Sequence, residues 1–253
     1  MRTYPIIAFY MLLAGAQQSA AQDYQYPTEE IEKVYIVANT TIVLKAHAHP
    51  YLLIPSPENK RAKKNDSGLK PAFKKDNTGF NVWVENTRRT LNIESYQPRF
   101  ADPLILYLPA SLKVSVENRY HTDVRISGFS NEIEVKANHG DVIIENVNGP
   151  LILDCGHGNT YVTFTEVNQS SPMSIINSHG MIDITLPQET SANLELDVPR
   201  GELYSEFELA GMKTNKKGFQ KGRASDQLTS ELNGGGVPIM IFSSWGDVYL
   251  RKQ

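Results

Sequence analysis

The sequence predicts an all-β protein, a β-solenoid-like roll with a strand-rich N-terminal part. Three observations predict this class. Apolar and polar residues alternate with period two in one segment after another, as in half-buried strands. A phrase made of a strand, a corner and a second strand recurs through the C-terminal half of the chain. Apolar residues at helical spacing are rare, so no significant helix is expected outside the first residues.

The first 21 residues are typical of a signal peptide. Arg2 is followed by the apolar stretch PIIAFYMLLAGA, which is too short to span a bilayer comfortably. The small residues of QSAAQ then suit a cleavage site, and we expect cleavage near Ala21. No later segment is apolar enough for a membrane-spanning helix. The mature chain is therefore expected to be exported, either to the periplasm or to the cell surface and beyond.

The remaining chain is expected to consist of a polar lead, residues 22–30, and one β domain, residues 31–253. Two segments rich in Lys, Asn and Gly lack periodicity and are expected to be loop insertions, at residues 56–79 and 210–236. LILYLPASLKV and IDITLPQETSANLEL resemble each other, a strand ending in Leu-Pro followed by a turn and another strand. This echo predicts that the N-terminal strands join the same core as the repeats.

Corner repeats occupy residues 104–253. A glycine follows the corner residue in every copy but the first, and glycine permits a positive φ without a Cβ clash. One unit cannot cover its own apolar face, so stacking units at the ~4.8 Å strand spacing would build a continuous core. We call the six aligned residues the corner column: His121, His139, His157, His179, Arg200 and Trp245.

The four histidines of the corner column allow three interpretations. Two or three of them, His121, His139, His157 or His179, could share a zinc ion, but a row spreads its ligands instead of converging them tetrahedrally. Closely stacked imidazoles would also repel one another once protonated, which would weaken the column below about pH 6. The third interpretation is a plain turn position, because histidine tolerates unusual φ values. The exchange for arginine and tryptophan in later copies favours this third interpretation, and no cofactor is expected.

The most specific motif is C-terminal: a glycine cluster, a strand, a small polar pair, Gly-Asp and a final strand. Together with the preceding repeats, the chain resembles the bacterial putative adhesin domain family over about Val34 to Lys252. The resemblance implies a β-solenoid-like domain of unknown function, an envelope or surface location and an interaction role. It supplies no catalytic residues. The segments that carry it are LYLPASLKVSVENRYHTDVRISG, EIEVKANHGDVIIENVNGPLILDCGHG, INSHGMIDITLP and LNGGGVPIMIFSSWGDVYLRK.

We expect the protein not to be an enzyme. Asp123, Asp141 and Asp247 share one position of the repeat and could line an edge, but like-charged residues on exposed turns are usually solvated. The sequence has no nucleophile elbow, zinc-protease motif, phosphate-binding loop or dinucleotide fingerprint. Two alternatives stay open: a polysaccharide-active lyase or hydrolase built on a β-helix, and a structural or envelope-stress-linked periplasmic component.

Two basic segments suggest a partner. KRAKKNDSGLKPAFKK and KTNKKGFQKGR lie on a chain whose net charge is −3, so they could attract an anionic glycan or an envelope component. Nucleic acid is not expected, because the chain is exported and its basic loops lack interleaved aromatic residues. The candidate partner-binding residues are Lys213, Lys216, Lys217, Lys221, Arg223 and Trp245.

The single cysteine, Cys155, rules out an internal disulfide framework. A free cysteine usually behaves as a small core residue, so we expect a buried thiol with no catalytic role.

Overall fold

The all-β prediction is confirmed. The computed structural model describes residues 22–56, 76–98, 100–210, 213–214, 220–222 and 228–253, in which strands are the only regular secondary structure. No helix that could cross a membrane is found in this part of the chain. The expected signal peptide and most of the first expected insertion lie outside it.

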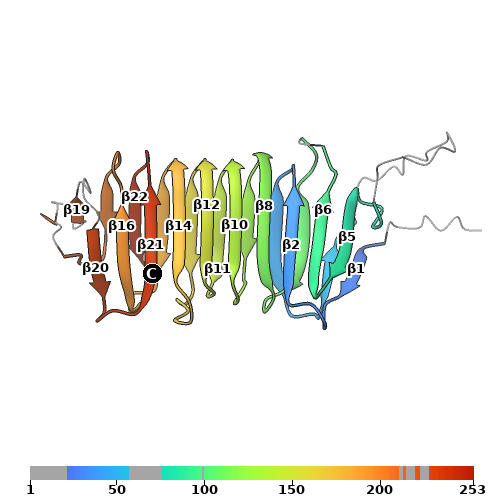
Figure 1. Cartoon of the computed structure of the whole chain (residues 1–253), viewed down its shortest axis with the longest axis horizontal. Coiled ribbons are helices and arrows are strands. Elements are labelled where there is room, and N and C mark those ends of the chain that lie inside the picture. Colours follow the sequence, from blue (N-terminus) through green and yellow to red (C-terminus); the bar gives the residue numbers. More distant parts are fainter. Residues whose placement is uncertain (1–21, 57–75, 99, 211–212, 215–219, 223–227) are drawn as a thin grey trace, which may run out of the picture.

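The strands form two large mixed sheets, which Figure 1 shows as the front and back layers of one elongated stack. The first sheet has 12 strands, in the order β1 (Tyr24–Pro27), β4 (Tyr51–Ile54), β7 (Leu104–Pro109), β3 (Ile42–His47), β9 (Val124–Ser127), β11 (Val142–Val147), β13 (Thr160–Phe164), β15 (Ile182–Leu186), β22 (Val248–Lys252), β17 (Leu203–Ser205), β19 (Gln220–Gly222) and β18 (Lys213–Thr214). The second sheet has 10 strands, in the order β20 (Leu228–Leu232), β16 (Ala192–Asp197), β21 (Val237–Ser243), β14 (Met173–His179), β12 (Leu151–His157), β10 (Ile133–His139), β8 (Lys113–His121), β2 (Lys33–Ala38), β6 (Thr90–Ser95) and β5 (Val82–Thr87).

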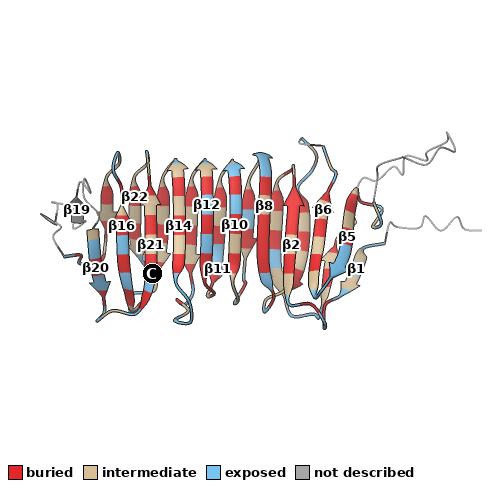
Figure 2. Ribbon diagram, viewed as in Figure 1, coloured by how far each residue is buried: buried red, intermediate tan, exposed pale blue. Residues whose placement is uncertain are grey.

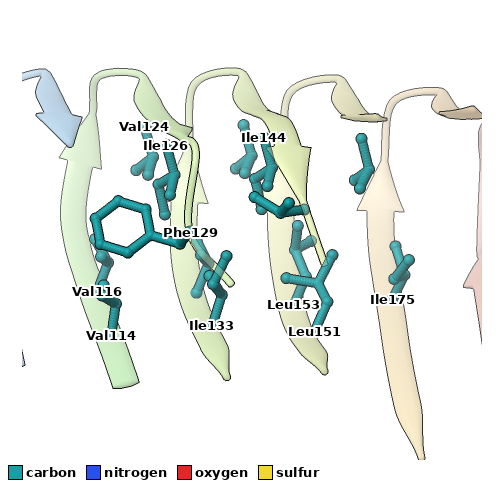
Figure 3. Close-up of a cluster of buried hydrophobic side chains, with 14 of the residues drawn as sticks. Val114, Val116, Val124, Ile126, Phe129, Ile133, Ile144, Leu151, Leu153 and Ile175 are labelled. Carbon is teal, nitrogen blue, oxygen red and sulfur yellow. The ribbon is translucent and has the colours of Figure 1, made fainter. Parts of the chain in front are cut away.

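Each repeat contributes one strand to each sheet, and neighbouring repeats pair in parallel and in register. Ile133 pairs with Leu151 in the second sheet, and Val142 pairs with Thr160 in the first. Every second side chain of these strands points between the sheets and is buried, which produces the alternation in Figure 2. Figure 3 shows part of the resulting core, in which aliphatic side chains of both sheets surround the fully buried Phe129. The period-two pattern of the sequence thus reflects the alternation of residues that face the core between the sheets with residues that face outward.

The first repeat is one residue longer than the others. Ile133 pairs with Val114 and His139 pairs with His121, with a register shift between Ala137 and His139. A β-bulge in β8 absorbs the extra residue, because a bulge places two residues opposite one without moving the rest of the strand. His121 therefore remains in line with the other histidines.

The N-terminal strands lie in the same stack. Strand β2 lies between β6 and β8, and β3 lies between β7 and β9, all in parallel. Their apolar residues belong to the same buried cluster as those of the repeats.

The spatial order of the repeats differs from their order in the sequence. Strand β21 lies between β14 and β16, and β22 lies between β15 and β17. The last repeat of the chain is therefore inserted before the preceding one. At this end of the stack, repeats that follow one another in the sequence are not all neighbours in space.

Two segments contain strands that the sequence reading missed. The polar lead contains β1, which pairs antiparallel with β4 and rests Tyr24 and Tyr26 against the core. The second expected loop insertion contains β20, which pairs antiparallel with β16 and buries Leu232. Both strands are short and pair at the ends of the stack, so their alternation extends over only a few residues.

Candidate functional site: the corner column

The corners are built so tightly that only glycine fits. Gly140 and Gly158 have φ values of 97° and 127°, which L side chains rarely adopt. A Cβ on Gly158 would also overlap the carbonyl oxygen of Gly140, and a Cβ on Gly180 would overlap that of Gly158. Each corner glycine therefore serves both its own turn and the close approach of the next rung.

Acidic and amide side chains tie each corner to the next. The Asp123 carboxylate accepts a hydrogen bond from the Asp141 backbone N–H (3.1 Å), and Asp141 accepts one from Asn159 N–H (2.8 Å). Asn159 Oδ1 in turn accepts the N–H of Met181 (3.2 Å). The same contact joins Asp247 to Glu202 N–H (2.8 Å). These side chains form a ladder of backbone acceptors, which accounts for the shared position of the aspartates in the repeat.

A buried amide holds the corner at His179 from inside. Asn177 is fully buried, and its Nδ2 donates to the carbonyl oxygen of Gly158 (2.8 Å) while its Oδ1 accepts from His179 N–H (3.0 Å). Asn118 plays a similar part in the first repeat, donating to Thr122 O (3.0 Å). The sequence alignment did not single out these asparagines, since other repeats have Ala137 or Cys155 at their position.

Cys155 is buried, as predicted. Burial raises the pKa of its thiol from 9.0 to about 11. The neutral thiol is a poor nucleophile, so this residue contributes packing to the corner instead of chemistry.

The six residues of the corner column form one continuous row on the surface. The ring centroids of His121 and His139 are 3.8 Å apart, and those of His139 and His157 are 4.6 Å apart. His157 and His179 stack at 4.4 Å with planes only 2° from parallel. The row lies where β8, β10, β12 and β14 end, along one long edge of the stack in Figure 1.

Trp245 and Arg200 complete the row. The indole of Trp245 is stacked with His179 at 6.1 Å, and the Arg200 guanidinium carbon lies 4.0 Å from the centroid of the Trp245 ring. Trp245 is 55% exposed, although it has contacts on both sides. The swapped order of the last repeats is what places tryptophan between histidine and arginine.

The arrangement of the histidines does not converge on a metal ion. Nitrogen lone pairs lie in the plane of each imidazole, and the planes of His139, His157 and His179 are nearly parallel. A tetrahedral zinc site needs lone pairs that point at one centre. Among the described residues, no group of three or more histidine, cysteine or acidic side chains is placed to hold a metal ion.

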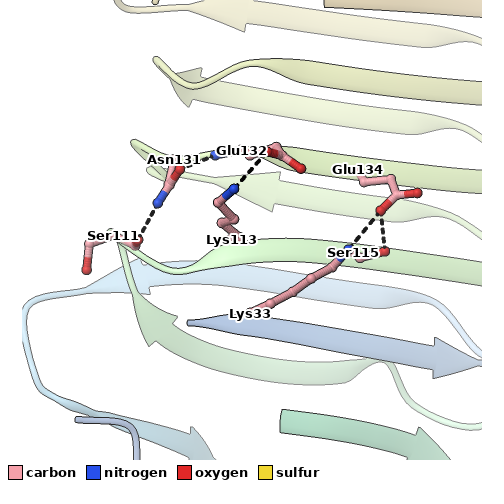
Figure 4. Close-up of polar contacts among 7 residues, drawn as sticks. All are labelled: Lys33, Ser111, Lys113, Ser115, Asn131, Glu132 and Glu134. Carbon is pink, nitrogen blue, oxygen red and sulfur yellow. Dashed lines mark hydrogen bonds and ion pairs between the residues drawn. The ribbon is translucent and has the colours of Figure 1, made fainter. Parts of the chain in front are cut away.

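The outer face of the second sheet carries charges that are already paired (Figure 4). Lys33 Nζ lies 3.1 Å from Glu134 Oε2, and Ser115 Oγ donates to the same oxygen at 2.9 Å. The Ser115 hydrogen bond and the ammonium of Lys33 lower the pKa of Glu134. Lys113 and Glu132 form a second pair at 3.1 Å. These contacts cross-link β2, β8 and β10.

The basic candidates are only partly placed. Lys213 in β18 pairs with Lys221 in β19, and nothing further is described of either residue. Lys216, Lys217 and Arg223 lie outside the described residues. Trp245 is thus the one partner-binding candidate with a defined side-chain environment.

A groove that the sequence did not indicate lies near the C-terminal end of the stack. It has a volume of about 900 Å³ and is lined by β14, β16, β20 and β21. Glu195, Glu208, Glu231 and Met240 contribute to its walls. The sequence could not reveal the groove, because it forms where β20 and β21 pair on the two sides of β16.

No known protein family model matches this chain. No curated protein matches its sequence. Two crystal structures match this one. One is described as a "putative cell adhesion protein" from Clostridium sporogenes, with 9% identity and a TM-score of 0.43 over 92% of this chain and 99% of that one. The other is described as a "putative adhesin" from Bacteroides fragilis, with 12% identity and a TM-score of 0.39 over 92% of this chain and 96% of that one.

Proposed function

We propose that this chain is a non-catalytic, exported protein of the cell envelope or surface, an adhesion or interaction module that uses the corner column as its contact surface. The proposal takes the fold to be a β-solenoid-like roll, in which each rung presents one residue to the row. The single observation that carries it is the continuous surface row from His121 to Arg200, in which neighbouring rings are stacked or tilted against one another and Arg200 lies over the Trp245 ring.

Rigidity supports a binding role for this row. The residues stand at the ends of strands that are paired on both sides, and the corner ladder fixes the turns that follow. A ligand would therefore find the rings already aligned, and little conformational entropy would be lost on binding. Exposed aromatic rings such as Trp245 are also enriched where proteins bind their partners.

The surroundings of the acids support a non-catalytic role. A glycosidase needs two carboxyl groups facing one substrate bond, one of them with a raised pKa. Asp123 and Asp141 instead point along the stack to backbone N–H groups, and Asp123 also pairs with Arg125 at 3.0 Å. These acids stabilise the corners.

The test is a binding screen of the purified protein against an array of acidic, neutral and amino-sugar polysaccharides. We expect at least one class to be retained, with a roughly tenfold weaker signal for Trp245→Ala. Ile152→Ala is the matched control, because Ile152 is a comparably exposed apolar residue, at 45%, on the outward side of β12. Equal loss in both variants, or chain shortening of a bound polysaccharide, would contradict the proposal.

A further inference from the structure

We propose that the corner column binds a linear polysaccharide that carries carboxylate groups, and that protonation of its histidines strengthens this binding. The inference rests on the proposed function and names the class of ligand for the same surface.

The imidazole nitrogens are free to meet such a ligand. Among the described residues, none forms a hydrogen bond with the side-chain nitrogens of His121, His139, His157 or His179; the bond at His179 uses its backbone N–H. His121, His157 and His179 are exposed, and His139 is half-buried. The row therefore offers hydrogen-bond donors in single file at the spacing of parallel strands.

Protonation changes the energetics of the row. Histidine is the side chain whose ordinary titration falls between pH 5 and 8. Two like charges about 4 Å apart repel one another, and more strongly near a protein surface than in bulk water. Neighbouring imidazolium rings at 3.8–4.6 Å would therefore repel one another, and carboxylates lying along the row would relieve that repulsion. Anion binding and proton uptake are then coupled, and each favours the other.

The charges that surround the row determine its net charge, and so whether it attracts an anion. Arg119 and Arg200 add positive charge at the two ends of the row, although Arg119 also pairs with Glu117. Lys136 and Asp154 stand on the outward sides of β10 and β12, three residues before the corners, and have opposite signs. The acidic side chains two residues after the corners are Asp123, Asp141, Glu202 and Asp247. With neutral imidazoles the surface is thus mixed in charge, and each imidazole that takes up a proton makes the row more cationic.

Three features favour a polysaccharide over other anions. The row is one residue wide and continuous, which fits an extended chain with a charge on each unit. Trp245 is 55% exposed, and because His179 and Arg200 contact its two ring faces, it offers the edge of its indole as an apolar contact for a sugar ring. Beside it, the planar guanidinium of Arg200 suits bidentate contact with a carboxylate. Polyglutamate could meet the same charges, but it has no ring to pack against the edge of the indole.

The experiment is isothermal titration calorimetry of the protein with oligogalacturonate at pH 5.5 and pH 7.5. We expect binding at pH 5.5 and affinity at least tenfold weaker at pH 7.5. At an intermediate pH, titrations in two buffers of different ionisation enthalpy should show net proton uptake. The double variant His139→Gln/His157→Gln should lose most of the pH dependence. His49→Gln is the control, because this exposed histidine lies outside the corner column, and it should behave as the wild type.

The other outcomes separate this inference from the proposed function. If the wild type does not bind oligogalacturonate at either pH but binds another envelope polysaccharide, the proposed ligand class is wrong and the interaction role stands. Equal affinity for polyglutamate would overturn the polysaccharide assignment. Binding that is independent of pH, or that keeps its pH dependence in the double variant, would overturn the role of the histidines. Thermal unfolding of the double variant close to that of the wild type would confirm that the loss is local.

Discussion

The corner glycines meet two structural requirements at one position: a positive φ and a close contact with the neighbouring backbone. The sequence showed a glycine after the corner residue and predicted a positive φ, which the structure confirms for Gly140, Gly158 and Gly180. The second reason, overlap of any Cβ with the carbonyl oxygen of the neighbouring rung, depends on how closely the corners stack. That distance is a property of the assembled stack, so the sequence alone could not give it.

Replacing Gly158 by alanine should lower the free energy of unfolding by about 2–4 kcal/mol, from backbone strain and the overlap with Gly140. Gly234→Ala is the matched control. Gly234 also has a positive φ, 84°, but a Cβ there meets no atom within 4 Å. Its cost should be about 1–2 kcal/mol. Urea unfolding measures both, and equal losses would show that φ alone explains the corner glycines.

Cys155 should be unreactive in the folded protein. Its pKa of about 11 leaves almost no thiolate at pH 8, and burial blocks access. Labelling with a disulfide reagent at pH 8 should be at least about a hundredfold slower than in denaturant. The raised pKa also stabilises the fold below about pH 8.5, and this contribution should disappear as the pH rises towards 11. Rapid labelling of the native protein would contradict the burial.

At the scale of the element, polar side chains replace backbone partners at corners and edges. The alternation of apolar residues predicted most strands, but it did not reveal which polar residues complete them. Asn77, in the loop before β5, is an example, because it contacts the outermost strand of the second sheet. Its side-chain amide donates to Val84 O (2.7 Å) and accepts from Val84 N–H (2.9 Å). In the sequence it is one more polar residue in a loop.

The edge contact of Asn77 predicts a change in association. Asn77→Ala should uncover the Val84 backbone groups of β5, and open strand edges pair with other chains. We expect a loss of about 1–2 kcal/mol in stability and more oligomer in size-exclusion chromatography. Asn86→Ala, an exposed position on the same strand, should stay like the wild type. A monomeric Asn77→Ala variant would show that the edge is protected by something else.

The hydrogen-bond ladder of the corners predicts that two substitutions of Asp141 differ in their effect on stability. Asp141→Ala removes the acceptor for the Asn159 N–H and should cost about 1–2 kcal/mol. Asp141→Asn keeps an acceptor oxygen and should recover most of that loss. Chemical unfolding distinguishes the pair. If alanine and asparagine are equally tolerated, the ladder contributes nothing to the corner.

At the scale of the whole molecule, the repeat was predictable and the order of its copies was not. All the rungs have the same apolar pattern, so their pattern alone lets any rung pair with any other in register. The order depends on the chain connections. The first strand pair, β2 and β3, and the last, β21 and β22, each lie one place inside the outermost parallel strand at their end of the stack. The candidate site, too, could be predicted only in part from the sequence. The sequence identified its six residues, but the contact of Trp245 with both His179 and Arg200 required the spatial order.

The continuous row therefore depends on one architectural claim, that β21 lies between β14 and β16. Cysteine cross-linking tests it most directly, in a Cys155→Ala background. Ser174 and Glu195 are both register partners of Met240, on opposite sides of β21. A disulfide needs Cα atoms within about 7 Å, which adjacent strands at ~4.8 Å allow and strands two apart do not. We predict oxidation of Ser174→Cys/Met240→Cys to a disulfide and none for Ser174→Cys/Glu195→Cys. The reverse result would place the repeats in sequence order and contradict the row from His121 to Arg200.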